Sequence, residues 1–164
     1  MPEAPVSIGS RLELLLDDYL IESLSGGARL QLHRPVRREV VFQSDAPWEG
    51  NACGYQAVFR DGPICRLYYH GLHYTNGGKP AEARPDHPWV LCYAESDDGI
   101  HWRRPELDLC EFSGSKKNNI ILTPESVAAI KGDPAHTAVF KDANPDCPAH
   151  ARYKCVIVGR PSGL

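Results

Sequence analysis

Short apolar runs bounded by turn-forming residues follow one another along most of this chain. The runs are rich in β-branched and aromatic residues, and 14 glycines and 14 prolines separate many of them. Such a pattern is typical of short strands joined by turns. We predict strands over residues 11–16, 28–33, 39–43, 55–60, 66–72, 89–96, 118–122, 137–141 and 152–158.

One segment, residues 123–132, has the pattern of a helix instead. Thr123 can cap its first turn, Pro124 is tolerated there, and Gly132 can terminate it. The pattern as a whole predicts an all-β chain with one short helix.

The chain also repeats a short sequence. "AVFRD" at residues 57–61 recurs as "AVFKD" at residues 138–142, 81 residues later. Each copy is followed by a turn and by a second strand that opens with arginine and an aromatic residue, "RLYY" at 66–69 and "RYKC" at 152–155. The recurrence predicts two related units that bury their faces by stacking on one another.

The first unit contains four predicted strands, residues 54–60, 66–72, 89–96 and 100–104. Four antiparallel strands joined by hairpins form one blade of a β-propeller. The fold prediction is therefore all-β, as a partial five-bladed β-propeller, and a β-sandwich is the alternative. We predict one domain, with an entry segment containing strands at residues 1–44, a first blade at 45–117 and the start of a second blade at 118–164.

A motif of serine, aspartate, glycine and tryptophan lies between the third and fourth strands of this unit. Ser96, Asp98, Gly99 and Trp102 give the pattern S-x-D-G-x-x-W. Asp-Gly can adopt the positive φ angles of a tight hairpin, and the serine and aspartate side chains can accept hydrogen bonds from turn amides. Trp102 can then bury its indole, so we interpret the motif as structural rather than catalytic.

This hairpin resembles the aspartate-box turn of sialidase propellers and, more closely, a structural hairpin of the five-bladed glycoside hydrolases of families 32, 43, 68 and 130. Further similar segments are "LLLDDYLIE" (14–22), "APWEGNACGYQAVFRDG" (46–62), "RLYYHG" (66–71), "KNNIIL" (117–122) and "FKDANPDCPAHARYK" (140–154). The resemblance implies a propeller that hydrolyses glycosidic bonds with paired carboxylates and no cofactor. The N-D-P-N-G and R-D-P motifs of family 32 are absent, which argues against sucrose or fructan as the substrate.

In these hydrolases the catalytic acids lie near the innermost strand of each blade. The resemblance therefore points to residues just before the two copies of the repeat. The candidate catalytic residues are Glu49, Asp45 and Asp133, and the candidate substrate-binding residues are Trp48, Asn51 and His136.

Glu49 is the preferred carboxylate, because the neighbouring Trp48 could stack on a sugar and raise the pKa of the acid by desolvation. The alternative for Glu49 is an exposed loop acid beside a core tryptophan. Asp61 and Asp142, which end the two copies of the repeat, are interpreted as turn caps.

Composition excludes several classes of function. The formal net charge of −3 predicts no nucleic-acid partner, and no apolar run reaches the length of about 18 residues that a membrane span needs. The N-terminus lacks the pattern of a secretory signal, so we expect a cytoplasmic protein, or a secreted or periplasmic one if a leader is missing. The six cysteines form no C-x-x-C pair, and we expect buried free thiols.

No metal is expected, because His70 and His73 are three residues apart and would point to opposite faces of a strand. We predict a glycoside hydrolase-like protein acting on a carbohydrate that the sequence does not identify. A five-bladed propeller requires about 250 residues, so a chain of 164 residues is expected to have little hydrolytic activity alone. The alternative is a non-catalytic carbohydrate-binding or structural β module.

Overall fold

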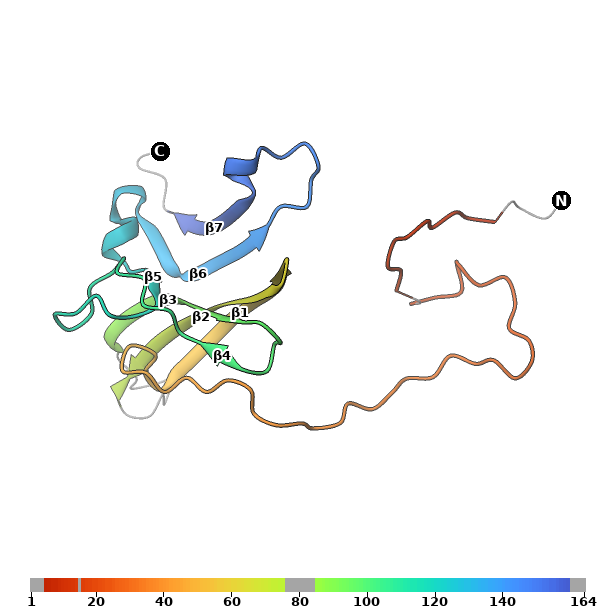
Figure 1. Ribbon diagram of the computed structural model, residues 1–164, viewed down its shortest axis with the longest axis horizontal. Helices are drawn as coiled ribbons and strands as arrows, with labels where there is room; N and C mark the ends of the chain where they lie inside the picture. The colour runs from red at the N-terminus through yellow and green to blue at the C-terminus, as the bar shows by residue number, and fades with distance from the viewer. Residues whose placement is uncertain (1–4, 15, 76–84, 160–164) are drawn as a thin grey trace. The chain divides into compact units, whose positions relative to one another are not determined.

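The structure, a computed structural model, describes residues 5–14, 16–75 and 85–159. The chain divides into two units, Met1–Arg38 and Glu39–Leu164. Every strand in the described part of the chain belongs to the second unit, and these strands form two antiparallel sheets (Figure 1). The all-β prediction is confirmed for these residues.

The larger sheet follows the chain in order. It consists of β1 (Ala52–Asp61), β2 (Ile64–Tyr74), β3 (Pro85–Ser96) and β4 (Trp102–Arg103), each antiparallel to the next, and β5 (Ile120–Leu122) adds a pairing with β3. This is the four-stranded meander that the sequence predicts for a blade. β1 and β2 are joined by a two-residue turn in which Gly62 has a φ of 62°, a conformation that glycine adopts without strain.

The smaller sheet is a hairpin of β6 (Gly132–Lys141) and β7 (Tyr153–Gly159). Two short 3₁₀ helices flank its strands, η2 (Glu125–Ile130) before β6 and η3 (Ala149–Ala151) before β7. The predicted helix at 123–132 therefore forms as a 3₁₀ helix, and the left-handed residue that ends it is Lys131, with a φ of 48°, rather than Gly132.

The predicted entry strands do not form. The described residues before Gly50 contain turns and irregular chain, so the strands predicted at 28–33 and 39–43 are wrong. The strand predicted at 11–16 is wrong at residues 11–14 and 16, and its residue 15 lies outside the described residues. The leucines that gave the alternating pattern are exposed, for example Leu12 at 102%, Leu14 at 80% and Leu32 at 97%. An alternating pattern forms a strand only where a neighbouring strand completes its hydrogen bonds, and no sheet pairing among the described residues includes these segments.

The two copies of the repeat form equivalent hairpins with different connections. β1 pairs with β2 after two residues, whereas residues 142–152 separate β6 from β7. Neither sheet is closed, and a radial arrangement of blades stays a prediction.

The core lies on the face of the larger sheet formed by β2, β3 and β5. Its buried members include Leu67, Tyr69, Val90, Cys92, Ala94, Cys110 and Ile120, with Phe42, Trp48, Trp102 and Phe112 packed against them. All six cysteines are free thiols; Cys92, Cys110 and Cys147 are buried, whereas Cys53 and Cys155 are exposed.

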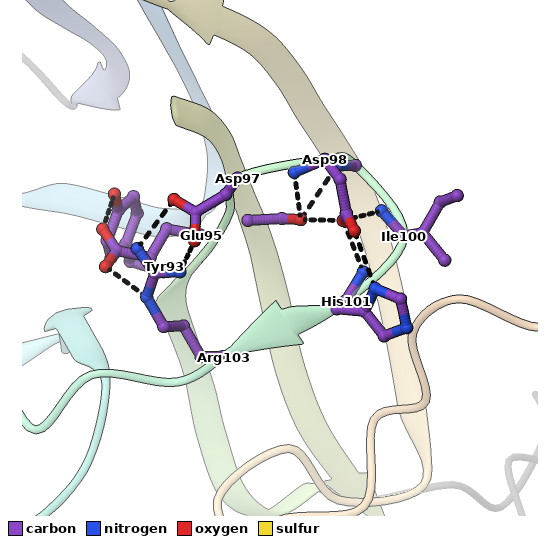
Figure 2. A network of polar contacts seen from close by, with 9 residues as sticks. Tyr93, Glu95, Asp97, Asp98, Ile100, His101 and Arg103 are labelled. Atoms are coloured by element: carbon purple, nitrogen blue, oxygen red, sulfur yellow. Dashed lines mark hydrogen bonds and ion pairs between the residues drawn. The ribbon is translucent and has the colours of Figure 1, made fainter. Parts of the chain in front are cut away.

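The S-x-D-G-x-x-W hairpin has the turn chemistry expected from its sequence (Figure 2). The Ser96 hydroxyl accepts a hydrogen bond from the Gly99 amide at 2.8 Å, and the Asp98 carboxylate accepts from the amides of residues 100 and 101, both at 2.8 Å. The Trp102 indole donates to the Gly99 carbonyl oxygen at 3.1 Å and packs on the core. The hydrogen bonds of Asp98 therefore stabilise the turn between β3 and β4.

Candidate functional site

The structure places the six predicted site residues in two separate groups. Asp45, Trp48, Glu49 and Asn51 lie on the loop that precedes β1, whereas Asp133 and His136 lie on β6. The two groups have different surroundings, and they are described in turn.

Glu49 is fully buried. Arg104 donates to both of its carboxylate oxygens, from Nε at 2.7 Å and from a terminal nitrogen at 2.9 Å, and the Tyr69 hydroxyl donates to Oε1. The backbone amide of Ala46 donates to Oε2 at 2.8 Å. A carboxylate with 0% exposed surface and four donors is arranged as a structural ion pair rather than as an acid that meets a substrate.

The loop that carries Glu49 packs directly on β2. A Cβ atom on Gly71 would lie 2.6 Å from the carbonyl oxygen of Trp48, so this close approach requires glycine. The Trp48 indole donates to Asn119 Oδ1 at 2.6 Å, and the Asn51 amide exchanges two hydrogen bonds of 2.8 Å with the backbone of Tyr74. Trp48 and Asn51 therefore fix the loop rather than face an open pocket.

Asp45 is the fourth predicted residue on this loop. Its side chain is 65% exposed and lies 3.2 Å from Arg104. An exposed ion pair contributes little to stability in water, so the contact of Arg104 with the buried Glu49 contributes more to the stability of the fold than its contact with Asp45 does.

On β6, Asp133 and His136 form a side-chain pair. The Asp133 carboxylate lies 2.8 Å from His136 Nδ1 and also accepts a hydrogen bond of 2.8 Å from the Ala135 amide. The hydrogen bond from His136 holds the pKa of Asp133 below its usual value, so this carboxylate is ionised at neutral pH. Both side chains are about half exposed, at 46% for Asp133 and 55% for His136.

Tyr55 lies beside this pair and has an unusual backbone. It sits in a β-bulge of β1, between Gly54 and Ala57, with a φ of 52°. A left-handed conformation is strained for a bulky side chain. Tyr55 is 59% exposed in this bulge, and its ring centroid lies 5.6 Å from that of His136 and 6.3 Å from that of Trp89.

His70 packs against the rings of Tyr55 and Trp89. It is fully buried on β2, and its ring centroid lies 5.7 Å from Tyr55 and 5.9 Å from Trp89. Its Nδ1 lies 3.2 Å from the Gly54 carbonyl oxygen and its Nε2 lies 2.8 Å from the Thr137 hydroxyl. Burial lowers the pKa of His70, so the imidazole is neutral and joins β2 to β6 by hydrogen bonds.

An open pocket of about 490 Å³ adjoins this cluster. Its walls include Trp89 on β3, Lys131 at the end of η2, Asp133 on β6 and Val158 on β7. Three prolines, Pro88, Pro124 and Pro134, also line it. The pocket therefore combines an indole and apolar surface with one carboxylate and one ammonium group.

The arrangement suits a ligand with a flat apolar face and a rim of hydroxyl groups. Aromatic rings can pack against such a face, and the carboxylate of Asp133 can accept hydrogen bonds from hydroxyls. Tyr55, His70, Trp89 and Lys131 were missed in the sequence prediction. A signal for Tyr55 existed, because it precedes its copy of the repeat by the same two residues as His136 does.

Two further features were searched for in the structure. Among the described residues, no three histidine, cysteine or acidic side chains are grouped so that they could hold a metal ion. Nor does the described part of the chain contain a helix with the length and apolar character that a membrane crossing requires.

The chain was compared with known proteins in three ways. No protein-family model, no curated protein and no solved structure matches it.

Proposed function

We propose that this chain binds a carbohydrate in the pocket beside Trp89 and Tyr55, as the sugar-binding part of a glycoside hydrolase-like protein. The observation that carries the proposal is the bulge at Tyr55, which holds an exposed aromatic ring in a left-handed backbone conformation. Strained residues of this kind concentrate at ligand clamps and active sites, where the rest of the structure maintains them.

The two aromatic rings offer a surface for a sugar. Tyr55 and Trp89 are tilted by 46° to one another, and the buried His70 contacts both. A pyranose ring presents C–H groups on one face, and these pack favourably on aromatic faces. The ionised Asp133, paired with His136, supplies an acceptor for the hydroxyl groups at the edge of that ring.

Glycosidic bond hydrolysis is the activity that the sequence resemblance suggests for this pocket. It needs two carboxyl groups about 5 to 9.5 Å apart. Asp133 is the carboxylate among the described residues that line the pocket, and Glu49 is buried elsewhere in an ion pair. We therefore propose Asp133 as one of the two carboxyl groups that hydrolysis would use.

The test is direct titration of the chain with a panel of neutral and acidic oligosaccharides, followed by calorimetry. Sugar binding by the wild-type chain should be lost in Trp89→Ala and retained in Tyr19→Ala, which truncates an exposed tyrosine of the other unit. Release of reducing ends, measured in parallel, tests hydrolysis, and Asp133→Asn should abolish any such activity. Failure of every sugar to bind, or equal binding by Trp89→Ala, would contradict the proposal.

A further inference from the structure

Lys131 is a cation on the wall of the pocket that no carboxylate neutralises. Among the described residues, the other lysines at the strand ends of this unit are paired, Lys141 with Asp61 and Lys154 with Asp142. No ion pair or side-chain hydrogen bond involves the ammonium group of Lys131 within the described part of the chain. Its charge is therefore available to a ligand.

The backbone conformation at the end of η2 fixes the position of the Lys131 Cα atom, from which this side chain extends. Lys131 follows η2 in a left-handed conformation, with a φ of 48°, and its amide donates to the Ala128 carbonyl oxygen at 2.9 Å. A flexible surface lysine on an irregular loop would lack this anchoring. Here the turn that ends η2 places Lys131 among the lining residues of the pocket, two residues before Asp133.

Asp133 does not cancel this charge. Its carboxylate accepts hydrogen bonds from His136 Nδ1 and from the Ala135 amide, both at 2.8 Å, and forms no ion pair with Lys131. The pocket thus has an ammonium group at one position and a hydrogen-bonded carboxylate at another. A carboxylate repels an anion but accepts hydrogen bonds from hydroxyls, so the two groups favour opposite ends of a ligand.

We propose that the ligand is an anionic sugar, whose negatively charged substituent binds Lys131 while its hydroxyl groups face Asp133 and its ring packs on Trp89. The proposal rests on the sugar-binding function proposed above and adds the charge of the substrate. The anion can be the carboxylate of a uronic acid or a sulfate ester, because both accept charge-assisted hydrogen bonds from an ammonium group.

The experiment uses a matched pair of ligands, an oligomer of galacturonic acid and its methyl ester. Both have the same rings and linkages, and they differ in charge. The acid should bind the wild-type chain at least about tenfold more tightly than the ester, since a hydrogen bond to a charged group contributes enough for this difference. A sulfated oligosaccharide of a neutral sugar, compared with its unsulfated form, shows whether sulfate serves instead.

Three variants identify the cation. Lys131→Gln should remove the preference for the charged ligand, Lys131→Arg should keep most of it, and Lys117→Gln, at an exposed lysine outside the pocket lining, should leave it unchanged. Thermal unfolding of each variant establishes that it is folded.

The outcomes separate this inference from the function beneath it. If charged and neutral sugars bind equally, or if Lys131→Gln keeps the preference, the role of Lys131 is refuted while sugar binding stands. If no sugar binds and Trp89→Ala changes nothing, both proposals fail. If the sulfated sugar alone depends on Lys131, the anionic ligand is a sulfate ester.

Discussion

Tyr55 and His136 occupy equivalent positions just before the two copies of the repeat, and their ring centroids lie 5.6 Å apart. Each residue comes two positions before the alanine that begins its copy, Ala57 or Ala138. The two hairpins therefore meet through equivalent residues, at the side of the pocket that Trp89 lines. The candidate site lies where one repeat contacts the other. The sequence of either repeat alone therefore does not reveal the site.

The left-handed backbone at Tyr55 should lower the stability of the folded chain relative to a variant with glycine at this position. We expect Tyr55→Gly to leave the free energy of unfolding unchanged or to raise it by up to about 1 kcal/mol, because glycine adopts a positive φ without strain. Sugar affinity should fall in the same variant. Urea unfolding and calorimetry measure the two effects.

Val58→Gly is the control for this experiment, since Val58 lies on the same strand with the same exposed fraction, 59%. Its φ is not left-handed, so this substitution should lower the free energy of unfolding by about 1 kcal/mol. Equal losses of stability in the two variants would show that the bulge at Tyr55 holds no strain.

Glu49 should behave as a structural acid. Glu49→Gln leaves the Arg104 guanidinium without its buried partner, and we expect a loss of about 3 kcal/mol in the free energy of unfolding. Sugar binding by the folded fraction should not change, because Glu49 does not line the pocket.

Asp45→Asn tests the exposed contact of the same arginine and should cost no more than about 0.5 kcal/mol, since the Asp45 side chain is 65% exposed. A fully stable Glu49→Gln chain that had lost sugar binding or turnover would instead support the catalytic role predicted from the sequence.

Asp61 joins the two sheets. Its carboxylate accepts hydrogen bonds from Arg66 on β2, Lys141 on β6 and Tyr153 on β7. These donors hold the pKa of Asp61 far below its usual value. We expect Asp61→Asn to increase amide hydrogen exchange along both β6 and β7, because this substitution removes the charge that holds the smaller sheet against the larger one.

Asp142, the equivalent residue of the second repeat, is the control. It contacts Lys154 and the Asn144 amide, both within its own hairpin. Asp142→Asn should therefore affect exchange near residues 142–154 alone. Faster exchange throughout β6 and β7 in Asp142→Asn, with none in Asp61→Asn, would contradict this assignment.

His70 should make the fold sensitive to mild acid. Burial lowers the pKa of His70 below its usual 6.5, so the unfolded chain binds a proton more readily than the folded chain does. The stabilising contribution is therefore complete above pH 6.5 and is lost as the pH falls from there toward the folded pKa. Two titratable neighbours on β6 act in opposite directions, since His136 lowers the pKa of His70 and Asp133 raises it.

Urea unfolding at pH 7.5 and 5.5 measures this effect, and His70→Gln should reduce the difference between the two values. His101→Gln provides a contrast, because the contact with Asp98 raises the pKa of His101. A raised pKa stabilises the fold below the unfolded value and loses that effect as the pH rises, so its removal should slightly enlarge the loss in acid. An unchanged pH dependence in His70→Gln would refute the assignment.

The local sequence pattern was sufficient to predict the hairpins of the larger sheet. The strands around "AVFRD", "RLYY" and "WVLCYAES" form nearly where the sequence predicts them, because alternation, turn residues and short loops act within a few residues of one another. The hairpin at Ser96 is a further case, since the hydrogen bonds that Ser96, Asp98 and Trp102 make in its turn all lie within residues 96–102.

The same local pattern failed where a partner strand was needed. Residues 11–14 and 28–33 alternate as a strand does, yet they stay exposed, because backbone hydrogen bonds between strands come from elsewhere in the chain. The surroundings of Glu49 also depended on distant residues. Its sequence neighbour Trp48 suggested an acid beside an open sugar site, whereas the structure buries this carboxylate against Arg104, 55 residues away.

The sequence by itself determined that the chain is rich in β-strands, which segments pair as hairpins, and that a five-residue segment recurs with one substitution. Only the tertiary structure decided which of the conspicuous acids is buried in an ion pair and which lines a pocket. The physical reason is that burial and electrostatic partners depend on contacts between distant segments, here β1, β3 and β6, which the pattern of any one segment does not specify.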